Sequence, residues 1–159
     1  MYHRPLLPDG IRPPDSFEGT GFVARPLRVT DAEDDFAAVM AARHRLKGAM
    51  DPDDPWPDGL TLHQNIVDLG WHEREFTLGH SFAWTVTAPK RIPTLGCCYL
   101  YPSDRAGFDA MAFWWVRPEA DGIAPALDRA FRAVVAALPL RTAFPGRDLP
   151  MADWRAPPP

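Results

Sequence analysis

Apolar and polar positions alternate most cleanly in the middle of the chain. In residues 81–87 every second side chain is large and apolar, which is the period of a β-strand with two different faces. Residues 94–101 and 109–116 are further apolar runs, separated by short turns that contain proline or glycine. Because these connections are short, the three runs are predicted to form an antiparallel meander.

Two capping boxes predict helix starts before this meander. Thr30 with Glu33 is the first, and Thr61 with Gln64 is the second. Apolar residues follow each box at helical spacings, and the sequence predicts that the first helix ends within residues 44–48. Gly70 is the expected stop of the second helix, because glycine favours the position after a last turn.

The longest apolar stripe lies after the meander, from Ile123 to Leu138, at spacings of three and four. Its helix is predicted to begin with Asp121 as a cap or at Ala124, since Pro125 must lie in the first turn. Residues 141–144 are then predicted to form a last strand, parallel to 109–116 and reached through that helix. Together with a strand at 22–27, this order indicates an α+β fold. The sheet should be mixed but mostly antiparallel, with one β-α-β crossover near the C-terminus.

Proline marks the expected domain limits. The chain has 159 residues and 19 prolines, which crowd both ends. We expect residues 1–20 to be a proline-rich N-terminal extension, 21–148 the folded domain and 149–159 a proline-rich tail. Both ends are predicted to be extended or poorly ordered.

Charge and cysteine content narrow the function classes. The formal net charge is -4, which argues against a nucleic-acid-binding surface. No apolar run reaches the roughly 18 residues of a membrane span, and the N-terminus lacks the apolar core of a secretory signal. The two cysteines, Cys97 and Cys98, are adjacent on a predicted strand, so they should point to opposite faces rather than form a disulfide. A cytoplasmic protein is therefore expected.

The stretch 109–124 is the strongest indication of a ligand. It predicts a strand, a short turn with a glycine, and then a helix start. Unpaired backbone N–H groups and the helix dipole at such a start favour a phosphate group.

The element order and several local patterns resemble the GNAT family of N-acetyltransferases over residues 21–148. The patterns are Arg25-Pro26-Leu27 followed by Asp31-Ala32, a strand at 95–102 with a glycine near its start, and the strand 113–116. The resemblance implies helices on both faces of the sheet and acetyl-coenzyme A as co-substrate. It also implies acetyl transfer to a primary amine, carried by a small molecule or a peptide.

In this family the pyrophosphate of coenzyme A binds at a Q/R-x-x-G-x-G/A motif, which corresponds here to residues 119–124. Gly122 and Ala124 match the motif, whereas Glu119 replaces the usual glutamine or arginine. Glu119 and Asp121 would each cost on the order of 1–3 kcal/mol at about 5 Å from a phosphate charge. The resemblance implies cofactor contacts from Trp115, Val116, Arg117, Gly122, Ile123 and Ala124.

Two residues are candidates for proton transfer. Asp109, at the start of a strand, lies near the position where the family often has a base carboxylate, and His80 could relay a proton. A solvated strand-end aspartate and a turn histidine are the alternatives. The cysteines have no histidine partner placed by the sequence, and the histidines show no recognised zinc-ligand spacing, so neither a nucleophile nor a metal site is expected.

Several alternatives stay open. The acidic loop 51–58 around Trp56 could attract a cationic amine or could simply be a solvated loop. The chain contains no tyrosine after Tyr101, where the family often has one that protonates the leaving thiolate. A non-catalytic binding or assembly module that has lost acetyl-coenzyme A binding is therefore the second hypothesis. An unrelated α+β ligand-binding fold is the third, and a homodimer is left open.

Overall fold

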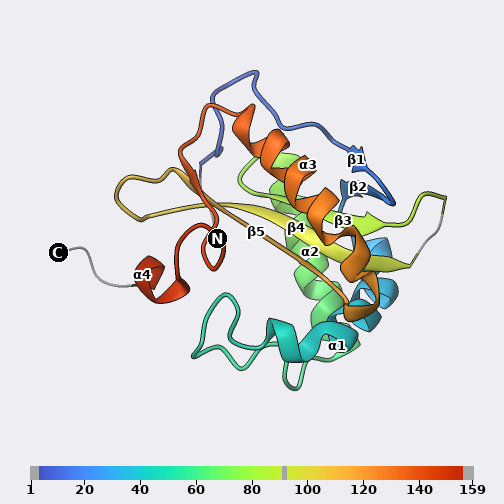
Figure 1. Cartoon of the computed structure of the whole chain (residues 1–159). Helices are drawn as coiled ribbons and strands as arrows, with labels where there is room; N and C mark the ends of the chain where they lie inside the picture. The colour runs from blue at the N-terminus through green and yellow to red at the C-terminus, as the bar shows by residue number, and fades with distance from the viewer. Residues whose placement is uncertain (1–3, 91–92, 156–159) are drawn as a thin grey trace.

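A computed structural model describes residues 4–90 and 93–155 of the chain (Figure 1). The strands are β1 (Phe17–Gly19), β2 (Phe22–Pro26), β3 (Phe82–Thr87), β4 (Thr94–Pro102), β5 (Ala110–Val116) and β6 (Thr142–Ala143). The helices are η1 (Val29–Asp31), α1 (Ala32–Leu46), α2 (Leu62–Leu78), η2 (Pro118–Ile123), α3 (Ala124–Ala136) and α4 (Met151–Arg155). The ends of the predicted extension and tail, 1–3 and 156–159, and residues 91–92 of a predicted turn lie outside the described residues.

All six strands form one sheet in the order β1-β2-β3-β4-β5-β6. Neighbouring strands are antiparallel from β1 to β5, while β6 is parallel to β5 and is reached through α3. The predicted meander of three strands is therefore confirmed as β3, β4 and β5. The α+β class with one crossover near the C-terminus is confirmed as well.

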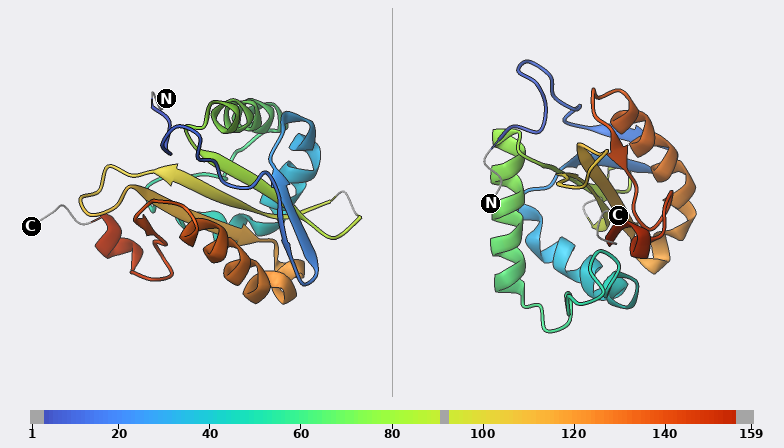
Figure 2. Two further views of the ribbon diagram at one scale, coloured as in Figure 1. Left: turned by 90° about the horizontal axis from the view of Figure 1, so that it is seen from above. Right: turned by 90° about the vertical axis from the view of Figure 1, so that its left-hand side faces the viewer.

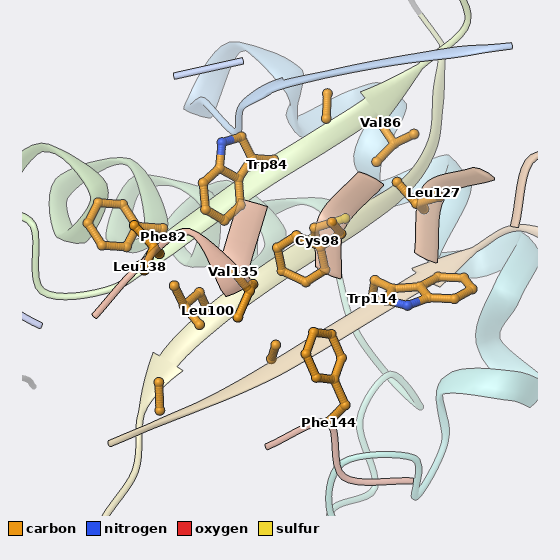
Figure 3. Close-up of a cluster of buried hydrophobic side chains, with 14 of the residues drawn as sticks. Phe82, Trp84, Val86, Cys98, Leu100, Trp114, Leu127, Val135, Leu138 and Phe144 are labelled. Carbon is orange, nitrogen blue, oxygen red and sulfur yellow. The ribbon is translucent and has the colours of Figure 1, made fainter. Parts of the chain in front are cut away.

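Helices cover both faces of this sheet (Figure 2). On one face the amphipathic α3 packs Leu127, Phe131 and Val135 into a cluster that includes Trp84 and Trp114 (Figure 3). A second cluster on the other face joins α1 and the first half of α2 to residues of β3, β4 and β5. Among the described residues, no helix combines the length and the apolar character that a membrane crossing requires.

Adjacent residues of β4 and β5 separate onto these two faces, as the two-residue period of a strand dictates. Cys98 and Trp114 belong to the α3 cluster, whereas Cys97 and Trp115 belong to the α1–α2 cluster. Both cysteines are buried and free, in agreement with the predicted absence of a disulfide between them.

Two local predictions about helix ends were wrong. Thr30 does not cap a helix: the turn there is η1, in which the Asp31 carboxylate accepts the Arg28 backbone N–H at 2.9 Å. Gly70 does not end α2, which continues to Leu78 and stops at Gly79, whose φ of 74° suits glycine. A single half-buried glycine costs too little to stop a helix whose later turns bury apolar side chains. The capping box of Thr61 and Gln64 is confirmed.

Both proline-rich ends contain structure that the pattern did not predict. Phe17 in β1 pairs with Ala24 of β2, and its ring lies 5.8 Å from that of Trp84 and 6.0 Å from that of Phe131. In α4, Trp154 contacts Phe108 with ring centroids 5.4 Å apart. Aromatic side chains thus bind both segments to the domain despite the prolines around them.

Candidate functional site

A cavity of about 450 Å³ lies between the sheet and the helices α1 and α2. Residues of β4 and β5 form its floor, α1 and α2 form its walls, and the acidic loop between these helices forms its rim. The volume lies within the range of small-molecule sites.

The floor follows from the strand period. Met111, Phe113 and Trp115 are alternate residues of β5, and Tyr99 and Tyr101 are alternate residues of β4, so all five point to the same face. We call the side chains of Tyr99, Tyr101, Phe113 and Trp115 the aromatic floor. Sheet register brings them together, because Tyr99 pairs with Phe113 and Tyr101 pairs with Met111.

The aromatic floor is held by stacking and by one internal hydrogen bond. Tyr99 stacks on Tyr101 with ring centroids 5.6 Å apart and on Phe113 at 6.5 Å. The indole Nε1 of Trp115 donates to the Tyr99 hydroxyl oxygen at 3.3 Å. Burial raises the pKa of Tyr99 well above its ordinary value, so its hydroxyl stays protonated.

A buried carboxyl group lies in the α1 wall. Asp35 is 3% exposed, and its oxygens accept hydrogen bonds from Asn65 Nδ2 at 3.0 Å and from Cys97 Sγ at 3.3 Å. Burial raises the pKa of Asp35, and the negative charges of Asp31 and Asp68 raise it further. Asp35 therefore lies in a polar contact network inside an otherwise apolar wall.

His72 lines the cavity from α2, with its ring 5.5 Å from that of Tyr99 and 4.9 Å from that of Trp71. Its Nδ1 atom is buried and has no hydrogen-bond partner among the described residues. Burial lowers the pKa of His72 to about 4, so the ring is neutral at neutral pH. A buried polar atom without a partner is uncommon and indicates an open position for a ligand or water.

The charge lining the cavity is negative. Four aspartates line it, and among the described lining residues there is no lysine or arginine. Asp51, on the rim, pairs with Arg155 of α4 at 2.7 Å. Asp35 and Asp68 form no ion pair with any described residue.

The far edge of β5 is the second feature of the site. β4 pairs with β5 along its whole length, from Ala110 to Val116, whereas β6 pairs only with Ala110 and Met111. Beyond Met111, this edge has no strand partner within the described residues. Arg147 lies there instead: its Nη2 donates to the Trp114 carbonyl oxygen at 2.8 Å, and its guanidinium carbon lies 3.5 Å from the centroid of the Trp114 ring.

The turn after β5 is a 3-10 helix that continues into α3. The Ala124 N–H donates to the Asp121 carbonyl, so this amide is already used within the chain. A Cβ atom at Gly122 would meet nothing within 4 Å, which means that the space above this residue is open. Of the two starts predicted for α3, the start at Ala124 is confirmed and the Asp121 cap is wrong, because α3 begins at Ala124 without a side-chain cap hydrogen bond.

Each acidic side chain of this turn has an arginine partner. Asp121 accepts from Nη2 of Arg45 at 2.8 Å, and Glu119 accepts from Nε of Arg117 at 3.0 Å. The hydrogen bond from Arg45 lowers the pKa of Asp121. A backbone hydrogen bond lowers the pKa of Glu119 most, and the hydrogen bond from Arg117 lowers it further. The two carboxylates that were expected to repel a pyrophosphate, Glu119 and Asp121, are therefore each paired with the positive charge of an arginine.

The six predicted cofactor contacts divide between three places. Trp115 belongs to the aromatic floor, while Val116 is buried on the α3 side of the sheet. The other four, Arg117, Gly122, Ile123 and Ala124, lie in or beside the turn at the end of β5. Their role in binding a cofactor stays a prediction.

Neither predicted proton-transfer residue lines the cavity. Asp109 accepts from the Arg141 backbone N at 2.8 Å and from its Nη2 at 2.9 Å, and these bonds lower the pKa of Asp109 to about 2. His80 Nδ1 lies 3.0 Å from Oε2 of the fully buried Glu75. Both side chains therefore have structural partners, and their catalytic role stays a prediction.

Sequence reasoning missed Asp35 and His72, although each carried a signal. Asp35 lies on the α1 face that buries Ala38, Val39 and Ala42, so a carboxyl group interrupts an apolar stripe. His72 follows the buried Leu69 by three residues on α2. Because the second helix was predicted to end at Gly70, His72 was not placed on the same helix face as Leu69, and its position in the cavity was not predicted.

No family model matches the chain, and no curated protein matches it in sequence. The solved structure of Mycobacterium smegmatis RimJ in complex with CoA-disulfide superposes with a TM-score of 0.67 at 16% identity, covering 90% of this chain and 75% of RimJ. The ribosomal-protein-S5-alanine acetyltransferase from Vibrio fischeri gives 0.61 at 18% identity, over 76% of this chain and 65% of that one. A Bordetella pertussis protein assigned to the GnaT family of acetyltransferases gives 0.56 at 18% identity, over 78% and 71%. The chain therefore has the fold of the GNAT acetyltransferases, as its sequence resemblance implied.

Proposed function

We propose that this protein transfers an acetyl group from acetyl-coenzyme A to a primary amine. One observation carries the proposal: the cavity floor includes Met111, Phe113 and Trp115 of β5. The far edge of this strand has no strand partner beyond Met111 in the described part of the chain. An extended cofactor arm on that edge and an acceptor in the cavity would approach the same strand from two sides. Holding two reactants together in this way supplies much of the rate enhancement in group transfer.

Cofactor binding would need two rearrangements in the residues near β5. The Arg147 guanidinium would have to leave the Trp114 carbonyl, because a cofactor amide on this edge needs that acceptor. Arg45 and Arg117 could each exchange a carboxylate for a phosphate, since both pairs are exposed and hence weak. The open space above Gly122 leaves room for a phosphate close to the backbone.

The chemistry needs a neutral amine and a proton acceptor. The amine nitrogen forms a bond to the thioester carbonyl carbon, the carbon–sulfur bond breaks, the amine loses a proton and the thiolate gains one. His72 is the group we propose for accepting a hydrogen bond from the attacking amine, because its Nδ1 lacks a partner in the described chain. Its pKa of about 4 makes the ring a weak base, so the role proposed for it is to orient the amine. Asp109 and His80 stay candidates from the sequence.

Calorimetric titration of the full chain with acetyl-coenzyme A tests the proposal. We expect saturable heat and an increase in melting temperature, and a larger affinity for Arg147→Ala than for the wild type. Arg129→Ala is the matched control, because Arg129 is an exposed arginine of α3, whereas the bond to the Trp114 carbonyl comes from Arg147. Absence of both heat and thermal stabilisation at millimolar ligand, in the wild type and in Arg147→Ala, would refute the proposal.

A non-catalytic binding module is the second candidate, and two contacts favour it. Arg147 occupies the Trp114 carbonyl, and the Ala124 amide is bonded within the turn. A protein with this function would bind a ligand in the cavity but would not bind acetyl-coenzyme A. The same titration therefore separates the two functions.

A further inference from the structure

Two carboxyl groups of the cavity lack a cation. Asp35 on α1 and Asp68 on α2 both line it, and neither has an ion-pair partner in the described part of the chain. They are close enough for the charge of Asp68 to contribute to the raised pKa of Asp35. A bound cation would reverse this unfavourable interaction, because an opposite charge stabilises an ionised carboxylate.

His72 adds an acceptor on the same wall. Since its ring is neutral, one nitrogen carries a proton and the other has a free lone pair. Nδ1 is buried without a partner among the described residues. A ligand that donates several hydrogen bonds, as an ammonium group does, would satisfy this atom and the carboxyl oxygens together.

The rest of the cavity suits an apolar group. The aromatic floor covers one side, and Trp56 and Trp71 line the rim and the α2 wall. Aromatic faces attract cations as well as apolar stems, by about 0.5–2 kcal/mol for each well-placed cation. With no lysine or arginine among the described lining residues, an anionic ligand would meet only repulsion.

We propose that this cavity binds a primary ammonium group carried on an aromatic or apolar stem. The ammonium lies at Asp35, Asp68 and His72, and the stem lies on the aromatic floor. The assignment as an acceptor site rests on the proposed acetyl transfer, whereas the binding itself requires no acetyl-coenzyme A.

Three probes of matched shape test the binding by calorimetry on the full chain at neutral pH: phenethylamine, phenethyl alcohol and phenylacetate. We expect phenethylammonium to bind at least about tenfold more tightly than the alcohol, which corresponds to about 1.4 kcal/mol. Phenylacetate should not bind measurably. Equal affinity for the amine and the alcohol, or tighter binding of phenylacetate, would overturn the proposal.

Two variants locate the head group. Asp68→Asn should weaken phenethylammonium binding by about five- to tenfold and leave alcohol binding unchanged, since Asp68 is exposed and its replacement should not disturb folding. Glu33→Gln, on an exposed side chain of α1 outside the cavity, is its control. His72→Leu should also weaken the binding of phenethylammonium, whereas His63→Leu, on the exposed face of α2, should leave it unchanged. If Asp68→Asn binds the amine like the wild type, the head-group position is wrong.

A peptide arm separates the two sources of such an ammonium. Phe-Ala-Ala with a free N-terminus is compared with the same peptide N-acetylated. Selective binding of the free peptide supports the proposal and assigns the site to protein N-termini, whereas binding of phenethylamine alone supports it and assigns the site to small amines. Ammonium binding without acetyl-coenzyme A binding would contradict the proposed transferase function and leave this inference intact. Acetyl-coenzyme A binding without any selectivity for the ammonium group would contradict this inference and leave the proposed transferase function intact.

Discussion

Gly96 of β4 lies directly against the carbonyl oxygen of Trp115 in β5, so that a Cβ atom at position 96 would fall 2.0 Å from that oxygen. Its distance to the Val116 Cα would be 2.8 Å, and both contacts are with backbone. Separation of the two strands would be needed to admit a methyl group. This contact therefore fixes the approach of β4 and β5 where the cavity floor begins.

Gly96→Ala should consequently destabilise the fold by about 3 kcal/mol or more, because neither backbone can yield without breaking sheet hydrogen bonds. Chemical denaturation measures the change. Gly70→Ala is the control: it lies inside α2 with nothing within 4 Å of the new Cβ, and should stabilise by about 0.5–1 kcal/mol. Wild-type stability of Gly96→Ala would contradict this close contact between the two strands.

Thr61→Ala should lower the free energy of unfolding by about 1 kcal/mol. The Thr61 hydroxyl oxygen accepts the Gln64 backbone N–H at 3.2 Å, and its loss leaves an unpaired donor at the start of α2. Thr30→Ala should change stability by less than about 0.5 kcal/mol, since Thr30 makes no cap hydrogen bond. Equal losses for the two variants would contradict the assignment of the caps.

Stability should fall as the pH is lowered from about 6.5 to 4, because His72 is neutral when folded and becomes protonated when unfolded. Its folded pKa of about 4 lies below the ordinary value, so this contribution is complete above pH 6.5 and is lost on acidification. The loss amounts to up to about 3 kcal/mol.

Asp35 acts with the opposite sign, because its pKa is raised and its contribution is lost as the pH rises. The difference between the wild type and His72→Gln therefore isolates His72. Denaturation at a series of pH values should show a smaller acid loss in His72→Gln and the full loss in His63→Gln. An unchanged pH profile in His72→Gln would rule out a buried neutral imidazole.

Cys97 and Cys98 should not react with a thiol reagent in the folded protein. Burial raises the pKa of both thiols well above the ordinary value, and the thiolate is the reactive form. Titration with a chromogenic disulfide should report no reaction before unfolding and two thiols after addition of denaturant. Rapid reaction of one thiol in native buffer would mean that its face of the sheet opens to solvent.

Sequence periodicity predicted the sheet well because its signals are local. The alternation lies within the few residues of β3, and the apolar stripe lies within the few turns of α3. The Thr61 capping box joins two residues that are only three positions apart. The errors arose where tertiary contacts decide. Burial of Phe76 in the core stabilises the part of α2 beyond Gly70. The ring contacts of Phe17 stabilise an edge strand within a proline-rich segment.

The candidate site was less predictable for the same reason. Trp115 and the acidic loop were visible as candidates, but the cavity joins them to Asp35 and His72, which come from helices distant in sequence. Arg147 had no local pattern that linked it to Trp114, 33 residues away. Long-range pairs of this kind follow from the folded arrangement and have no period to detect.

The rim of the cavity is built from two parts of the chain that are far apart in sequence. Arg155 bonds to the Met50 carbonyl across 105 positions and pairs with Asp51, while Lys47 pairs with Asp58 inside the loop itself. The width of the entrance is therefore controlled by docking of α4 as well as by the loop. A change in α4, which contributes no residue to the cavity lining, is therefore expected to alter how fast a ligand enters and leaves.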